Sequence, residues 1–287
     1  MDFGLRIVLK MFAEIITMSE EKLVLCMKWG DMYGPEYVNV LYGMVSRHCS
    51  YPFRLICFTD DADGVRPEVE CFPLPTLGVE VPPEAPGKWP KQALWSKDLF
   101  GLQGVALFLD LDSVIVDSID PYFEFGHDDD VVTARNWTKP WKRMSQTSVF
   151  RFRIGTHAYM LEQLQANPHL MVKYRFEQNY VSSCIRGGVQ FWPEQWTKHF
   201  GLHSMGIWPM RYLRPPRQPK GVRIVTFPGS PKPADAIRGA WNHKSQSRSP
   251  QQQLQWINQQ RKAGKKWRKQ LSRYVQPTPW VADHWHE

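Results

Sequence analysis

Two carboxylates, Asp110 and Asp112, follow the apolar run Val105-Ala-Leu-Phe-Leu109. Acids two residues apart at the end of a strand can project in the same direction and hold a hard divalent cation, which in turn binds a diphosphate. An Asp-x-Asp pair alone is weak evidence for a metal site, because such pairs also occur in loops and helix caps. Its place after an apolar strand strengthens it, since burying two charges is costly unless something binds them. The pair predicts metal-assisted chemistry on a phosphorylated donor.

Two lysines fit the same chemistry. A phosphorylated leaving group gathers negative charge, and a divalent ion together with a lysine neutralises it. Lys97 falls in a predicted helix, where a lysine is otherwise usually a solvated charge. Lys232 stands between two prolines just after Gly229, a residue that lets the backbone approach a phosphate closely.

Apolar runs alternating with helical periodicity supply the framework. Strands are predicted at residues 22–27, 53–58, 105–116, 130–134, 149–154 and 222–227, and helices at 35–48, 91–102 and 156–167. This alternation predicts an α/β sandwich on a mostly parallel sheet. Ligands of such sheets bind beyond the carboxyl ends of the strands, so Trp29, Asp110 and Gly229 are expected to face one crevice. Residues 67–90, rich in Pro and Gly, predict a surface excursion, either a binding loop or a plain one.

The net charge of +8 is unevenly placed: residues 243–287 hold nine Lys/Arg against two acids, and the remainder holds 27 against 26. We expect a body at 22–242, preceded by an extension at 1–21 that is not a signal peptide. We expect residues 243–287 to form a basic tail with an amphipathic helix. Such a tail either binds an anionic surface or is simply a solvated helical face. Five cysteines without a CxxC pair predict reduced thiols and a cytoplasmic location. The basic tail adds the expectation of peripheral contact with the cytoplasmic face of a membrane.

Four blocks in order carry a resemblance. The stretch Phe108 to Phe123 resembles the metal-binding strand of GT-A glycosyltransferases, most of all the retaining family eight group of glycogenin and bacterial lipopolysaccharide galactosyltransferases. Met27 to Tyr33 is similar to the segment that cradles the nucleobase, Trp95-Ser-Lys97 to a helix position whose basic residue contacts the donor, and Thr226 to Pro233 to a block whose lysine binds the diphosphate. The resemblance assigns donor binding to Lys28, Trp29, Gly30, Tyr33, Lys97, Asp110, Leu111, Asp112, Gly229 and Lys232.

The resemblance implies a GT-A, Rossmann-like three-layer sandwich. It further implies a UDP-sugar donor, Mn²⁺ or Mg²⁺ held by Asp110 and Asp112, and a glycan, lipid-linked or lipopolysaccharide acceptor. The family's metal-binding His corresponds to Thr226, so diphosphate oxygens and water would complete the ion's shell and metal affinity would be weaker. Glu177-Gln178 matches an Asp-Gln pair near the reacting carbon. Gln178 would lie beneath the sugar, while Glu177 orients its hydroxyls or stabilises positive charge, with front-face attack and retention.

Other interpretations stay open. Tyr33 also fits an ordinary buried aromatic. A haloacid-dehalogenase-type phosphatase would use Asp110 as its nucleophile, but it needs an acidic pair after a strand, and residues 128–130 precede one. A non-enzymatic module whose tail binds an anionic membrane, or less readily a nucleic acid, would leave Asp110 and Asp112 unexplained.

Overall fold

The first strand, β1 (Lys22–Lys28), shows how the sheet is buried on both faces. In the computed structural model, which describes residues 21–287, its side chains alternate between two hydrophobic clusters. Val24 and Cys26 enter one cluster, whereas Leu23 and Leu25 enter the other. A strand covered on both sides reads as a continuous apolar run, which is why the sequence pattern identified it.

Seven strands form the central sheet in the order β3-β2-β1-β4-β7-β6-β8. Their bounds are β2 (Phe53–Thr59), β3 (Glu70–Phe72), β4 (Val105–Leu109), β6 (Val132–Arg135), β7 (Ser145–Arg153) and β8 (Gln190–Phe191). Only the β4/β7 and β6/β7 pairs among them are antiparallel, so the prediction of a mostly parallel sheet is confirmed.

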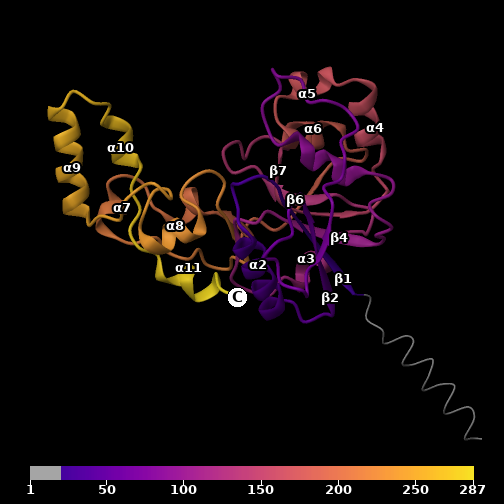
Figure 1. The fold of residues 1–287 in the computed structure, drawn as a ribbon, viewed down its shortest axis with the longest axis horizontal. Helices are drawn as coiled ribbons and strands as arrows, with labels where there is room; N and C mark the ends of the chain where they lie inside the picture. The colour runs from indigo at the N-terminus through magenta and orange to yellow at the C-terminus, as the bar shows by residue number, and fades with distance from the viewer. Residues whose placement is uncertain (1–20) are drawn as a thin grey trace, which may run out of the picture.

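Two different layers cover the sheet (Figure 1). One face carries α2 (Pro35–His48) and a second sheet, β5-β10-β9, formed by β5 (Ser113–Ile115), β9 (Thr197–His199) and β10 (Ile224–Thr226). The other face carries the 3₁₀ helix η1 (Trp89–Trp95), α4 (Tyr159–Ala166), α5 (His169–Tyr174) and α6 (Glu177–Cys184). The short helices between β5 and the C-terminal region that have not yet been named are α3 (Asp120–Glu124), η2 (Phe200–Ser204), α7 (Met210–Leu213) and α8 (Pro233–Arg238). This is the predicted three-layer arrangement.

Two of the predicted elements are wrong in extent. The strand predicted at 105–116 is split, because β4 and β5 belong to different sheets and a turn separates them. The helix predicted at 91–102 is the short η1, which ends at Trp95 because Ser96 is extended. Further along, Phe100 and Gly101 take positive φ values, so the helix does not resume before residue 102. A left-handed backbone cannot continue a right-handed helix. The excursion at 67–90 contains the edge strand β3.

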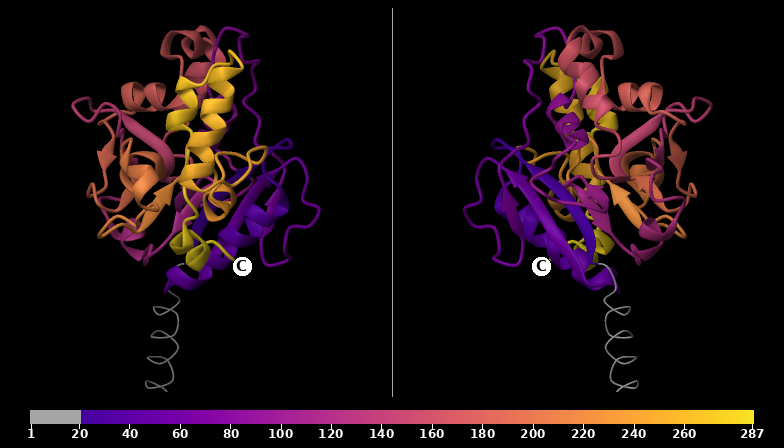
Figure 2. Two further views of the ribbon diagram at one scale, coloured as in Figure 1. Left: turned by 90° about the vertical axis from the view of Figure 1, so that its left-hand side faces the viewer. Right: turned by 90° about the vertical axis from the view of Figure 1, so that its right-hand side faces the viewer.

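The C-terminal region begins as a separate pair of helices and then returns to the body. The predicted amphipathic helix is divided into α9 (Pro250–Lys262) and α10 (Arg268–Ser272), with Gly264 at φ +69° between them. These helices stand side by side at one end of the molecule (Figures 1 and 2). After them, Val275 and the Val281 of α11 (Pro279–His284) are buried in the same cluster as α2. Arg47 of α2 donates to two carbonyls of the last residues, so the end of the chain is part of the body.

One prediction concerns the N-terminal segment. The extension predicted at 1–21 lies, apart from Glu21, outside the described residues. Among the helices of residues 21–287, none joins the length and the apolar character that crossing a bilayer requires.

The packing of α11 predicts that two apolar sites in the C-terminal region, Val281 and Leu254, differ strongly in their sensitivity to a charge. Val281→Asp is expected to lower the free energy of unfolding by about 3 kcal/mol or more, because Val281 is fully buried and the carboxylate would have no partner. Leu254→Asp on α9 is the matched control, since Leu254 is 49% exposed. Urea denaturation followed by circular dichroism measures both. Equal midpoints would show that α11 is not part of the core.

Candidate active site

Asp110, Leu111 and Asp112 form the turn that joins the two sheets. The amide of Asp110 still donates to the Ser148 carbonyl of β7 at 2.8 Å, as a residue of the central sheet does. The amide of Ser113 then donates to the Asp110 carbonyl at 3.0 Å, and β5 begins in the second sheet. Leu111 is buried in the core and anchors the turn. Both carboxylates therefore stand at the carboxyl end of β4, as the sequence predicted.

Asp112 is the meeting point of three segments. One of its carboxylate oxygens accepts a hydrogen bond from the Tyr33 hydroxyl at 2.8 Å and another from the Lys232 ammonium at 2.5 Å. Asp112 is only 6% exposed, and the Lys232 ammonium lies 5.2 Å from the centre of the Tyr33 ring. Tyr33 follows β1, Asp112 follows β4 and Lys232 follows β10. The structure thus brings together three residues that the sequence singled out separately.

The protonation states of Tyr33 and Asp112 depend on each other and on the Lys232 ammonium. Burial raises the pKa of the Asp112 carboxyl, the Lys232 ammonium opposes that rise, and the neighbouring Asp110 adds to it. Burial, reinforced by Asp112, raises the pKa of the Tyr33 phenol far above its usual value, so the hydroxyl keeps its proton and donates. Lys232 and, less strongly, the Tyr33 hydroxyl therefore favour the ionised form of Asp112, which any cation would require.

Asp110 has its own cation, Lys91 of η1. The Lys91 ammonium lies 2.6 Å from an Asp110 carboxylate oxygen and 3.2 Å from the Thr147 carbonyl. It also lies 4.6 Å from the centre of the Phe108 ring, at the distance of a cation–π contact. Asp110 is the more exposed of the two acids, with 30% of its side chain accessible. The site thus contains two carboxylates, each with one ammonium group.

Sequence reasoning missed Lys91 and selected Lys97. Lys97 lies beyond the end of η1 and is exposed, and no contact between it and the two carboxylates is present. Lys91 had a readable signal, since it is a lysine inside the run Trp89-Pro-Lys-Gln-Ala-Leu-Trp95, whose other members are mostly apolar. A lysine in the middle of a buried segment needs a partner.

Lys28 and Gly30, at and just after the end of β1, fix the loop that leads to Tyr33. The Lys28 ammonium, at 4% exposure, donates to the Asp61 carbonyl at 2.8 Å. The amide of Gly30, whose φ is +59°, donates to the Asp60 carboxylate at 2.9 Å. Both contacts fasten the loop after β1 to the loop after β2. The half-buried ring of Trp29 lies 5.4 Å from the Lys88 ammonium, just before η1.

Glu177 and Gln178 begin α6, which packs against η1 and β7. A Glu177 carboxylate oxygen accepts from the Lys88 amide at 3.3 Å, and the Gln178 carbonyl accepts from the Ser145 hydroxyl of β7 at 3.0 Å. Lys88 and Ser145 are close in sequence to Lys91 and Thr147, which contact each other. The segment before η1 and strand β7 therefore tie the start of α6 to the carboxylate pair. The side-chain amide oxygen of Gln146 in β7 accepts from the Ser148 amide at 2.6 Å.

The block after β10 places Lys232. Thr226 is fully buried, is paired in register with Ser113 and His199, and donates to the Lys198 carbonyl at 3.4 Å. Gly229 has φ +83°, a conformation that favours glycine. Lys232 is the N-cap residue of α8.

A hard divalent ion fits the donor set that these residues offer. Carboxylate oxygens are the ligands that Mn²⁺ and Mg²⁺ prefer. Within residues 21–287 no group of three or more His, Cys, Asp or Glu side chains is positioned as a complete metal site. An ion at Asp110 and Asp112 would therefore complete its shell with donor oxygens and water.

The acidic group that the phosphatase alternative requires is engaged elsewhere. Asp128 and Asp129 form ion pairs with Arg153 of β7. The Asp130 carboxylate accepts from the amide of His127, within the same loop. Nothing in these contacts joins the acids to Asp110.

Comparison with known proteins identifies the fold class. No protein-family model and no curated protein matches the chain. Among solved structures, the apo form of the bifunctional glycosyltransferase WbbM is similar with a TM-score of 0.53 and 14% identity, over 76% of this chain and 47% of that chain. GlyE from Streptococcus pneumoniae is similar with a TM-score of 0.51 and 13% identity, over 88% of this chain and 63% of that chain. The chain spans about half the length of WbbM. The predicted GT-A fold is confirmed.

The Asp112–Lys232 pair makes a pH-dependent prediction. Lys232→Met is expected to lower the free energy of unfolding by about 2 kcal/mol at neutral pH, less than for a fully buried pair because 22% of the Lys232 side chain is exposed. Without the ammonium the folded-state pKa of Asp112 rises further above its unfolded value. The deficit should therefore shrink as pH falls from about 8 to about 5 and Asp112 takes up a proton.

Urea denaturation at several pH values measures this effect. Lys97→Met is the matched control, because it removes an exposed lysine that has no carboxylate partner here. A deficit that stays constant with pH would mean that Lys232 does not stabilise the Asp112 carboxylate.

Proposed function

We propose that the protein is a metal-dependent glycosyltransferase. It transfers a hexose from a nucleoside-diphosphate sugar, with UDP as the nucleotide, to a glycan, lipid-linked or lipopolysaccharide acceptor, with retention. The observation that carries the proposal is the convergence of Tyr33, Asp110, Asp112 and Lys232 at the carboxyl ends of strands. In sheets of this kind that edge is where ligands bind. The fold similarity to solved glycosyltransferases supports the same class.

Asp110 and Asp112 would hold Mn²⁺ or Mg²⁺, and such an ion, when bound, neutralises charge on the leaving diphosphate. The two lysines have a second role in this arrangement. Lys91 and Lys232 now neutralise the carboxylates at 2.6 and 2.5 Å. With both carboxylates engaged by an ion, the two ammonium groups would be available to phosphate oxygens. Their charge is in place before the donor arrives, which is how preorganised sites stabilise a transition state.

The remaining residues take roles around the donor. Tyr33 and Trp29, which follow β1, line the nucleotide side, and Lys28 and Gly30 fix the loop that carries them. Glu177 and Gln178, at the start of α6, are assigned to the sugar side, where Glu177 would orient hydroxyls or stabilise positive charge at the anomeric carbon. An amide such as Gln178 is a poor nucleophile, so the acceptor attacks from the face of the departing diphosphate, which takes its proton.

Binding of UDP tests the proposal directly. UDP with Mn²⁺ is expected to raise the melting temperature by roughly 5 to 10 °C at saturating ligand, and UDP alone by much less. Asp110→Asn should abolish the metal-dependent part. The metal-dependent shift should also weaken at acidic pH, because the raised pKa of Asp112 favours its protonated form. Thermal unfolding with a panel of nucleotides measures all of these.

Substitutions of Lys91 and Lys97 form a matched test and control in the same assay. Lys91→Gln is expected to weaken UDP affinity about tenfold or more, the value of a charge-assisted hydrogen bond. Lys97→Gln removes the same charge from an exposed position and should leave affinity unchanged. An unchanged Lys91→Gln affinity would remove Lys91 from the donor site. Failure of every nucleotide to bind in the presence of Mn²⁺ would overturn the proposed function.

Peripheral membrane contact belongs to the same proposal. The exposed apolar residues Ile207, Trp208 and Leu213 lie on and just before α7. The α7 segment contacts the basic tail, since the Tyr212 hydroxyl donates to the Leu271 carbonyl at 3.0 Å. Apolar side chains next to a cationic segment suit the surface of an anionic bilayer, where a lipid-linked acceptor would be found.

Vesicle sedimentation checks this contact. The chain is expected to bind vesicles containing anionic phospholipid, and salt should weaken the binding. Lys265→Gln should reduce the affinity about fivefold, and Trp208→Ser should reduce it as well. Lys97→Gln is the charge-matched control away from the tail. Binding to neutral vesicles of equal strength, or none to anionic ones, would end this part of the proposal.

A further inference from the structure

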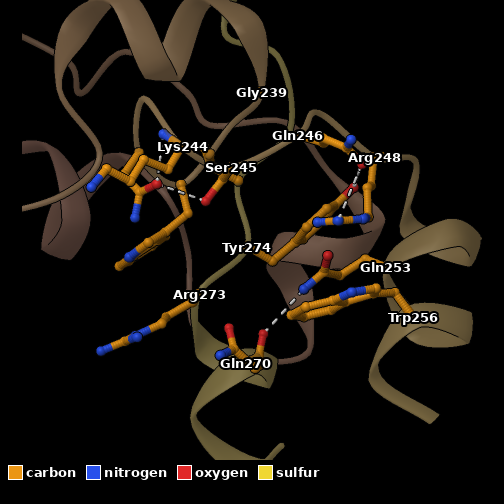
Figure 3. A pocket seen from close by; sticks show the side chains of 13 residues that line it. Gly239, Lys244, Ser245, Gln246, Arg248, Gln253, Trp256, Gln270, Arg273 and Tyr274 are labelled. Atoms are coloured by element: carbon orange, nitrogen blue, oxygen red, sulfur yellow. Dashed lines mark hydrogen bonds between the residues drawn. The ribbon is translucent and has the colours of Figure 1, made fainter. Parts of the chain in front are cut away.

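A hollow of about 400 Å³ lies in the C-terminal region, apart from the carboxylate pair. Three segments line it: residues 239–248 after α8, helix α9, and residues 270–275 from α10 onward. Figure 3 shows their side chains arranged around one space. Its volume falls within the range of small-molecule sites. Neither the donor nor the metal proposed above accounts for it.

The hollow is cationic. Lys244, Arg248 and Arg273 line it, and no acidic residue does. In the part of the chain that the structure describes, none of the three forms an ion pair with a carboxylate. Three positive groups around one cavity without a counter-charge repel one another unless an anion joins them. The charge pattern therefore selects an anionic ligand.

Aromatic rings and fixed amides give the hollow a second character. Trp241, Trp256 and Tyr274 contribute rings, and the Arg248 guanidinium lies 4.6 Å from the centre of the Trp256 ring. Gln253, buried at 3% exposure, donates to the Gln270 carbonyl at 3.3 Å, which fixes its amide (Figure 3). Amphipathic rings with oriented amides recognise ligands that have both C–H faces and hydroxyl groups. Sugars meet that description, whereas a bare inorganic anion uses only the charges.

Helix α8 relates the hollow to the carboxylate pair. Lys232 caps its N-terminus beside Asp112, and Gly239 caps its C-terminus at the wall of the hollow. A helix of six residues rises about 9 Å, so the two places are one short helix apart. A Cβ on Gly239 would lie 2.5 Å from Pro277, which shows how closely the returning chain holds this end of α8.

We propose that this hollow binds an anionic saccharide, a sugar that carries a phosphate or a carboxylate. Resting on the proposed glycosyltransferase function, the saccharide is the charged part of the acceptor. The cations bind its acidic group, the rings pack against its C–H face, and the amides bind its hydroxyls. The hollow then holds the acceptor one helix length from the donor phosphates.

Titration calorimetry on the full chain, without nucleotide or metal, tests the site. Glucose 1-phosphate and glucuronate are the two anionic probes, and glucose is the neutral one. At least one anionic probe is expected to bind, and glucose to bind at least about tenfold more weakly. If only glucose 1-phosphate binds tightly, the acidic group of the ligand is a phosphate; if only glucuronate does, it is a carboxylate. Equal binding of glucose, or no binding of either anion, overturns the proposal.

Variants locate the binding. Arg248→Gln and Trp256→Leu should each weaken the anionic probe about tenfold, with folding checked by circular dichroism. Lys262→Gln near the end of α9 is the charge-matched control, since Lys262 does not line the hollow. An unchanged affinity in both test variants, or displacement of the sugar by a short oligonucleotide that binds more tightly, contradicts a saccharide site.

Asp112→Asn separates this proposal from the preceding one. It should lose metal-dependent UDP binding and keep the affinity for the anionic probe. If wild-type protein binds the anionic sugar but no nucleotide, the saccharide site stands and the transferase function fails. If it binds nucleotide but no anionic sugar, the reverse holds.

Discussion

The buried contact between Asp112 and Lys232 is the constraint on which the rest of the site depends. A carboxylate at 6% exposure is costly to ionise, and the ammonium 2.5 Å away offsets that cost. The Tyr33 hydroxyl satisfies the same oxygen from another direction. Asp110 and Lys91 repeat the pattern closer to solvent. A site built from alternating charges of this kind is close to neutral by itself, and it is ready to accept a cation and an anion together.

Topology explains why these groups meet. β4 is the strand at which the central sheet changes from parallel to antiparallel pairing, with β1 on one side and β7 on the other. It is also where the chain leaves that sheet for the smaller one, through the turn 110–112. The carboxyl ends of β1 and β4 and the segment after β10 therefore face the same space. Neither sheet alone would bring Tyr33, Asp112 and Lys232 together.

The parts that sequence predicted well depend on short-range patterns. Buried parallel strands such as β1 and β4 are continuous apolar runs, and their predicted ends located Trp29 and Asp110. The failures depend on tertiary structure. Whether residues 105–116 stay in one sheet is decided by which strand pairs with β5, and that partner, β10, lies more than a hundred residues away. Lys97 was selected through the resemblance of Trp95-Ser-Lys97 to a family segment. In the structure η1 ends at Trp95, before Lys97, and the lysine paired with Asp110 is Lys91.

Helix α8 connects the carboxylate pair to the C-terminal segment. Its N-cap is Lys232, its third residue, Asp235, is buried and paired with Arg238, and its end at Gly239 packs against Pro277. A short helix fixed at both ends cannot shift without disturbing either the Asp112 contact or the packing of the C-terminal segment. The region after residue 243 is therefore more than a basic appendage: through α11 and α8 it helps to determine where the Lys232 ammonium stands. Substitutions in that packing would consequently reach the carboxylate pair through a rigid element, without touching it.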